Sequence, residues 1–96
     1  MRYLLLTYYT KPDGRIDEAM TVASRLKTND WQTANVILDF RDQKVLAASV
    51  KGQAATRDWS TIVSYYYPFY TNIIERLFEE NGHALNIVAD SSAKDA

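Results

Sequence analysis

The chain has no cysteine, three glycines, two prolines and one histidine. Without cysteine it can form no disulfide, thiolate nucleophile or zinc–sulfur centre, a composition that fits a reducing cytoplasm. Its isolated glycines, Gly14, Gly52 and Gly82, provide no glycine-rich loop to hold a phosphate. A lone imidazole makes no convincing transition-metal site, so we expect His83 to have a surface or capping role.

The sequence also lacks a long apolar run. The segment Met1–Leu6 is far too short for a signal peptide or a membrane span, so we expect a cytoplasmic protein without membrane contact. No serine lies in a nucleophile-elbow context. Asp17 and Glu18 are adjacent in an expected strand and therefore point to opposite faces. We predict no catalytic residue, metal or cofactor, and we place Glu18 at the sheet margin, where it could bond a tyrosine hydroxyl.

The net charge is −1, which predicts no partner by itself. Residues 1–57 contain nine Lys/Arg and six Asp/Glu, a balance of +3, and residues 58–96 contain two and six, a balance of −4. This asymmetry is either ordinary solvated surface or a basic sheet edge that meets an acidic partner or a phosphate chain.

The first half of the sequence has the two-residue alternation of half-buried strands. Residues 2–10 are rich in tyrosine, threonine and leucine, and Lys11–Gly14 is typical of a type I turn followed by a bulge. If Lys11 opposes Arg15, Leu6 faces Met20, Leu4 faces Val22 and Thr10 faces Ile16. This register places the large aliphatic side chains on one face, which supports the hairpin.

Two more strands follow a polar break at Lys27–Asp30. Residues 32–40 would place Ala34, Val36, Leu38 and Phe40 on one face, and residues 45–51 would place Leu46, Ala48 and Val50 inward. A three-residue loop at Asp42–Lys44 pairs Phe40 with Leu46. Asp39 and Asp42 flank this hairpin and are expected to serve its turn. The predicted sheet is a four-stranded antiparallel meander.

A helix is predicted over residues 57–82, capped by Thr56 or Asp58 and ended by Gly82. Pro68 either kinks this helix or breaks it in two, and the apolar phase favours one kinked helix. The helix covers one sheet face, which gives an α+β domain of ββββα order over residues 1–90. Residues 83–89 form a strand or a strap, and residues 91–96 are a disordered polar tail. The expected inward side of the helix consists of Trp59, Ile62, Val63, Tyr66, Phe69, Tyr70, Ile73, Ile74, Leu77 and Phe78.

The second sheet face is too apolar for a fully wet surface and too polar for a core. Either small domains tolerate such tyrosines, or the face is an association surface for another protein or a second copy in a homodimer. With an aromatic strip on the helix, the candidate partner-binding residues are Tyr3, Leu5, Tyr9, Ile37, Val45, Tyr65 and Tyr67.

The segments Met1–Tyr8, Lys11–Gly14 and Gln32–Phe40 resemble short uncharacterised proteins encoded by tailed bacteriophages. The resemblance covers about half of the chain and carries no catalytic signature. It implies a small viral protein in the host cytoplasm that binds and modulates a host or phage protein, and it assigns no functional residue.

The ββββα order also resembles the Pur-alpha repeat, the plant Whirly proteins and a transcriptional coactivator of the same topology, which form dimers and bind single strands. The alternative function is therefore single-stranded nucleic-acid binding, with Tyr3 and Tyr9 stacking on bases. The cations that would follow the phosphates are Arg2, Arg15, Arg25, Lys27, Arg41 and Lys44.

Overall fold

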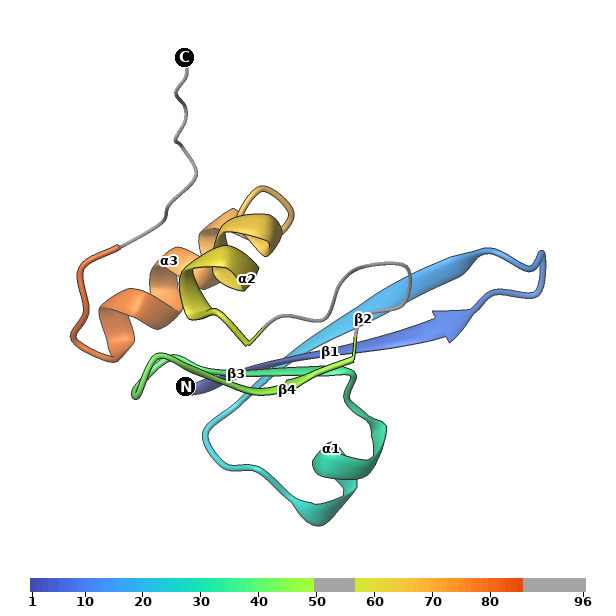
Figure 1. Ribbon diagram of the computed structural model, residues 1–96, viewed down its shortest axis with the longest axis horizontal. Coiled ribbons are helices and arrows are strands. Elements are labelled where there is room, and N and C mark those ends of the chain that lie inside the picture. Colours follow the sequence, from blue (N-terminus) through green and yellow to red (C-terminus); the bar gives the residue numbers. More distant parts are fainter. Residues whose placement is uncertain (50–56, 86–96) are drawn as a thin grey trace.

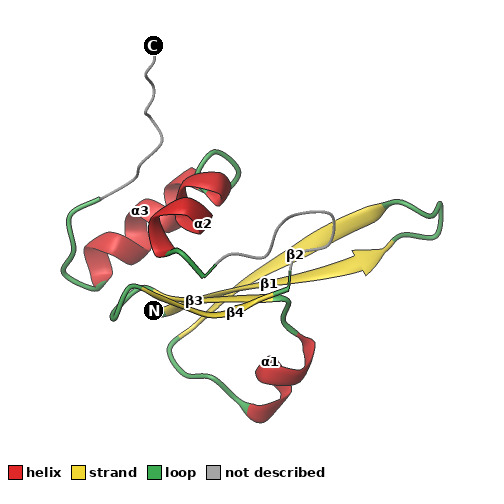
Figure 2. Ribbon diagram, viewed as in Figure 1, coloured by secondary structure: helices red, strands yellow, loops and turns green. Residues whose placement is uncertain are grey.

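The computed structural model describes residues 1–49 and 57–85 and shows an α+β fold (Figure 1). Its antiparallel sheet has four strands, β1 (Tyr3–Thr10), β2 (Ile16–Ala23), β3 (Val36–Asp39) and β4 (Lys44–Ala48). The helices are α1 (Thr28–Thr33), α2 (Trp59–Tyr66) and α3 (Thr71–Glu80). Helices α2 and α3 lie on one side of the sheet and α1 lies on the other (Figure 2).

The β1–β2 hairpin has the predicted register. Leu6 lies opposite Met20, Leu4 opposite Val22 and Thr10 opposite Ile16. The amide of Lys11 donates to the carbonyl of Arg15 at 2.7 Å, and Gly14 has the positive φ of 90° that the bulge requires. Because β3 pairs only with Tyr3–Leu6, the distal part of the hairpin extends beyond the rest of the sheet as an arm (Figure 1).

The predicted meander is wrong. The strand order is β2-β1-β3-β4, so β1 lies in the interior of the sheet and β3 pairs with β1 instead of β2. The cause is the connection after β2, which is long enough to form α1 and carries the chain beneath the sheet to the other side of β1 (Figure 1). In α1 the Asp30 carboxylate accepts from the Lys27 amide at 2.8 Å, which closes the first turn. This helix occupies much of the polar break and the start of the predicted 32–40 strand.

The predicted pairing of β3 with β4 is also wrong. Val36 lies opposite Ala48 and Leu38 opposite Val45, with a bulge that leaves Leu46 as the extra residue. The connection spans residues 40–43 instead of Asp42–Lys44, and Gln43 takes a left-handed φ of 54°. Because of the bulge, Val45 joins the core beneath the helices instead of the second face. Asp39 serves the turn as expected, accepting from the amides of Arg41 and Asp42.

Two helices replace the favoured single kinked helix. Helix α2 ends at Tyr66, Pro68 lies in the connection, and α3 begins at Thr71. Proline supplies no amide for a helical hydrogen bond, and it disfavours helical angles at the preceding residue. Asp58 caps α2 as predicted, accepting from the Thr61 amide at 2.9 Å. At Gly82 the chain has a φ of 76°, and the amide of His83 donates to the carbonyl of Phe78, which ends α3 in a Schellman motif.

The core lies between the sheet and the two C-terminal helices. Its fully buried members include Leu4, Leu6, Val36, Leu38 and Phe40 from the sheet side, and Ile62, Val63, Tyr66, Ile74, Leu77 and Phe78 from the helices. The predicted inward side of the helix is therefore largely confirmed. Phe69 is the exception, with 65% of its side chain exposed, because it follows Pro68 in the connection.

The second sheet face is covered at its centre. Leu5 and Ile37 are buried but do not belong to the main core, and they point to the side on which α1 lies. Their expected exposure was therefore wrong. Residues 83–85 are not a strand. The predicted roles of Thr56, Val50, residues 86–89 and the 91–96 tail lie outside the described residues.

Candidate protein-binding cleft

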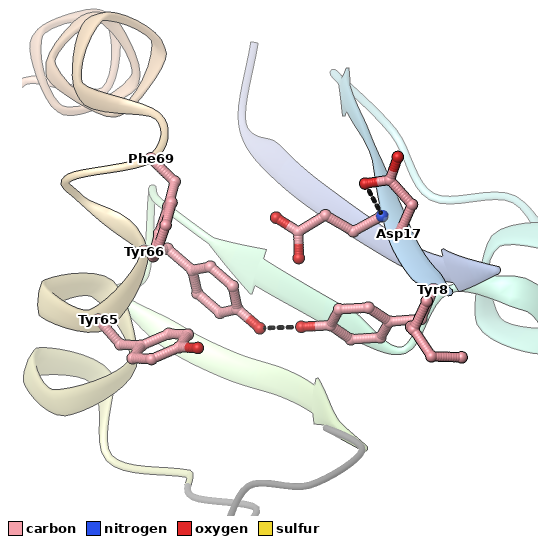
Figure 3. Close-up of a pocket in the computed structure, with 7 residues that line it drawn as sticks. Tyr8, Asp17, Tyr65, Tyr66 and Phe69 are labelled. Carbon is pink, nitrogen blue, oxygen red and sulfur yellow. Dashed lines mark hydrogen bonds between the residues drawn. The ribbon is translucent and has the colours of Figure 1, made fainter. Parts of the chain in front are cut away.

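An open cleft of about 310 Å³ lies between the hairpin arm and the connection of α2 to α3. Figure 3 shows Tyr8 reaching from β1 toward Tyr66 of α2, with Tyr65 and Phe69 beside them. The lining residues are Tyr8, Ile16, Asp17, Glu18, Tyr65, Tyr66 and Phe69. The cleft thus combines four aromatic rings with two acidic side chains.

The break at Pro68 accounts for the aromatic wall. Tyr65 is on the outer side of α2 and is 45% exposed, and Phe69 projects from the connection. The ring of Tyr65 packs edge-on against Tyr66 at a centroid separation of 4.9 Å and lies 5.9 Å from Phe69. These ring contacts hold two exposed aromatic side chains together without burying either of them.

The floor of the cleft carries tyrosine hydroxyls. Those of Tyr8 and Tyr66 share a hydrogen bond across the sheet–helix interface, and the hydroxyl of Tyr70 donates to the carboxylate of Glu18. Burial is the largest cause that raises the pKa of all three tyrosines, and nearby Glu18 raises each pKa further. The hydroxyls therefore stay neutral at physiological pH.

The two acidic residues of the cleft have different surroundings. The Asp17 carboxylate accepts from the Glu18 amide at 2.8 Å and lies 3.4 Å from the Lys11 ammonium. That amide, followed by Lys11, lowers the pKa of Asp17, so its charge is retained at neutral pH. Glu18 is half-buried, and within the described part of the chain no cationic group lies within ion-pair distance of it.

The seven predicted partner-binding residues differ in exposure and do not form one surface. Leu5, Ile37 and Val45 are buried within the chain. Tyr3 is half-buried under the guanidinium of Arg2, and Tyr67 is half-buried and donates to Glu75 at 2.5 Å.

Tyr9 and Tyr65 are exposed as expected, at 47% and 45%. Tyr65 lines the cleft, and Tyr9 lines a smaller hollow that shares Tyr8 and Ile16 with it. Ile16 and Phe69 also line the cleft, although neither was predicted as a site residue. The signal that could have identified Phe69 is Pro68, since a broken helix frees the next residue from the inward side.

The predicted nucleic-acid contacts do not gather at one place. Arg2 is paired with Asp39 at 2.8 Å and Arg15 with Asp13 at 2.8 Å. Arg15 lies at the tip of the hairpin arm, whereas Arg41 and Lys44 lie at the β3–β4 turn. None of the six cations, which also include Arg25 and Lys27, lines the aromatic cleft.

Residues 1–49 and 57–85 hold no group of three or more acidic or histidine side chains that could bind a metal ion. His83 has the surface role expected of it, with its imidazole Nε2 2.8 Å from the carbonyl oxygen of Arg41. No helix among the described residues is long and apolar enough to cross a membrane. Comparisons with protein-family models, curated proteins and solved structures gave no match.

Proposed function

We propose that this protein is a non-enzymatic binding module that holds a segment of a partner protein in the aromatic cleft. The observation that carries the proposal is the convergence of exposed Ile16, Tyr65 and Phe69 around one hollow. Large aromatic side chains beside a cleft are the groups that contribute most to protein–protein affinity.

The cleft is also preformed in the free chain. Tyr65 and Phe69 are held by ring contacts, and the floor is fixed by the hydrogen bonds of Tyr8 and Glu18. A partner segment would therefore bind without the entropic cost of ordering these side chains. We extend the proposal, on the sequence resemblance alone, to a phage accessory protein that acts on a host or phage protein.

A peptide-display selection on the immobilised protein tests this function. Peptides that bind the wild-type protein should lose at least about tenfold in affinity against Tyr65→Ala and against Phe69→Ala. Trp31→Ala is the matched control, because Trp31 is also an exposed aromatic residue, at 51%, and lies in α1 on the other side of the sheet. Equal binding to all of these variants would contradict the proposal.

Single-stranded nucleic acid is the competing ligand class. Fluorescence anisotropy with a labelled oligonucleotide at two salt concentrations distinguishes the two classes, since phosphate neutralisation weakens steeply with salt. Our proposal predicts no tight, salt-dependent binding. Micromolar or tighter binding of that kind, unaffected by Tyr65→Ala, would favour the nucleic-acid function instead.

A further inference from the structure

The charge arrangement of the cleft points to the chemistry of its ligand. Glu18 forms the wall on the β2 side, and its carboxylate accepts a hydrogen bond from the uncharged hydroxyl of Tyr70. A half-buried carboxylate without a cation is costly, because it has lost part of its hydration and gained no counter-charge. Asp17, by contrast, already has Lys11 as a counter-ion.

The aromatic wall favours the same kind of ligand. The face of an aromatic ring carries partial negative charge and attracts a cation placed over it. Tyr65 and Phe69 are exposed beside Glu18, and the neutral hydroxyl of Tyr66 adds an oxygen that can accept a hydrogen bond. No lysine, arginine or histidine is among the described residues that line the cleft.

We propose that the cleft receives an arginine side chain of the partner, with its guanidinium hydrogen-bonded to Glu18 and stacked on Tyr65 or Phe69. This inference rests on the proposed function and specifies its partner. A planar guanidinium suits this site because it pairs with a carboxylate through its edge while its face stacks on a ring. The cleft of about 310 Å³ has room for one such side chain.

The test uses the peptides selected on the wild-type protein, resynthesised with citrulline in place of each arginine. Citrulline has nearly the same shape but carries no charge. We expect the selected peptides to contain arginine, and we expect the citrulline versions to bind the wild-type protein at least about tenfold more weakly. Raising the salt concentration should reduce this preference only in part, because the site is half-buried.

The variant Glu18→Gln should remove most of the difference between arginine and citrulline peptides and leave only the smaller part that stacking on the rings contributes. Glutamine can still accept the hydrogen bond of Tyr70, so the wall is retained. Glu79→Gln, which removes an exposed carboxylate of α3, is the matched control and should keep the wild-type preference.

The outcomes separate the two proposals. Peptides that depend on Tyr65 and Phe69 but tolerate citrulline would overturn the arginine site and leave the binding function standing. A preference for arginine that Glu18→Gln leaves undiminished would also overturn it. If no selected peptide depends on Tyr65 or Phe69, both proposals fail.

Discussion

The hydroxyl of Tyr70, immediately before α3, donates a hydrogen bond to the carboxylate of Glu18 on β2. This contact joins the helical layer to the edge strand of the sheet across 52 positions of sequence. It also sets the position of the one cleft carboxylate that has no cation beside it in the described part of the chain. The contact between Tyr70 and Glu18 therefore contributes both to the stability of the domain and to the position of the cleft carboxylate.

Removing this hydroxyl should weaken the fold by a modest amount. We predict that Tyr70→Phe lowers the free energy of unfolding by about 1 kcal/mol, the usual net contribution of one hydrogen bond, because the partial exposure of the pair weakens its charged character. Urea denaturation followed by circular dichroism measures the change. Tyr9→Phe is the control, since its hydroxyl lies 3.3 Å from Asp17 at an exposed position, and it should leave stability unchanged. Equal losses in the two variants would contradict this view of the contact.

Breaking the ion pair of Arg2 and Asp39 should reduce the stability of the fold by a larger amount. Two hydrogen bonds of 2.8 Å join the guanidinium to the carboxylate, and Asp39 is only 2% exposed. We predict that Asp39→Asn destabilises the protein by about 1–3 kcal/mol, a range reduced for the partial exposure of Arg2. Asp42→Asn is the matched control, because its carboxylate is 48% exposed and 3.2 Å from Arg2. It should cost much less in the same denaturation experiment.

The same pair should make the stability of the protein depend on pH. Burial acts to raise the pKa of Asp39, but the hydrogen bonds from Arg2 and from the amides of Asp42 and Arg41 outweigh it, so the pKa lies below its ordinary value. The stability that this carboxylate contributes is therefore fully present above its pKa in the unfolded chain, about 3.9. It is lost as the pH falls through the lower pKa of the carboxylate in the folded protein. The stability difference between wild type and Asp39→Asn should shrink below about pH 4. A constant difference down to pH 2 would contradict the assignment.

Truncation of two apolar side chains from the predicted inward side should affect stability very differently. Ile74 is fully buried and Phe69 is 65% exposed. We predict that Ile74→Ala costs about 2–5 kcal/mol, whereas Phe69→Ala changes stability by less than about 0.5 kcal/mol. Thermal melts of the two variants make the comparison. A large loss for Phe69→Ala would mean that this ring belongs to the core and not to the cleft.

The features that the sequence predicted well depend on local chemistry. The turn at Lys11–Gly14 sets the hairpin register through one proline and one left-handed glycine. Gly82 ends α3 and Asp58 begins α2 for similarly local reasons. Each of these signals acts within a few residues, so no knowledge of the tertiary structure is needed to use it.

The features that were missed depend on contacts between distant segments. The strand order depends on which side of β1 the β2–β3 connection leads to. The alternation of apolar and polar residues along a strand does not indicate which strand lies next to it. The bulge at Leu46 changes which side chains of β4 point inward, and alternation alone cannot reveal it. For the cleft, the sequence indicated Tyr65, but only the fold brings it beside Ile16 and Glu18.

Engineered disulfides test the corrected strand order in a chain that has no cysteine of its own. Leu5 and Ile37 are direct partners across β1 and β3, so the double substitution Leu5→Cys/Ile37→Cys should cross-link under mild oxidation. Thr21 and Ile37 both lie opposite Leu5, on either side of it, which separates them by two strand spacings. That gap of roughly 10 Å exceeds the reach of a disulfide, so Thr21→Cys/Ile37→Cys should stay reduced. In the predicted meander β2 would lie between β1 and β3, so Leu5→Cys/Ile37→Cys would stay reduced.

The most direct test of the central claim is the affinity of one selected peptide, measured by titration calorimetry against the wild-type protein and the double variant Tyr65→Ala/Phe69→Ala. Both side chains are exposed, so the variant should stay folded, and its circular dichroism spectrum verifies this. We predict a dissociation constant at least about thirtyfold higher for the double variant, which corresponds to the loss of an interface hot spot, and no change for Trp31→Ala. A folded double variant that binds the peptide as tightly as the wild-type protein would show that the aromatic cleft is not the binding site.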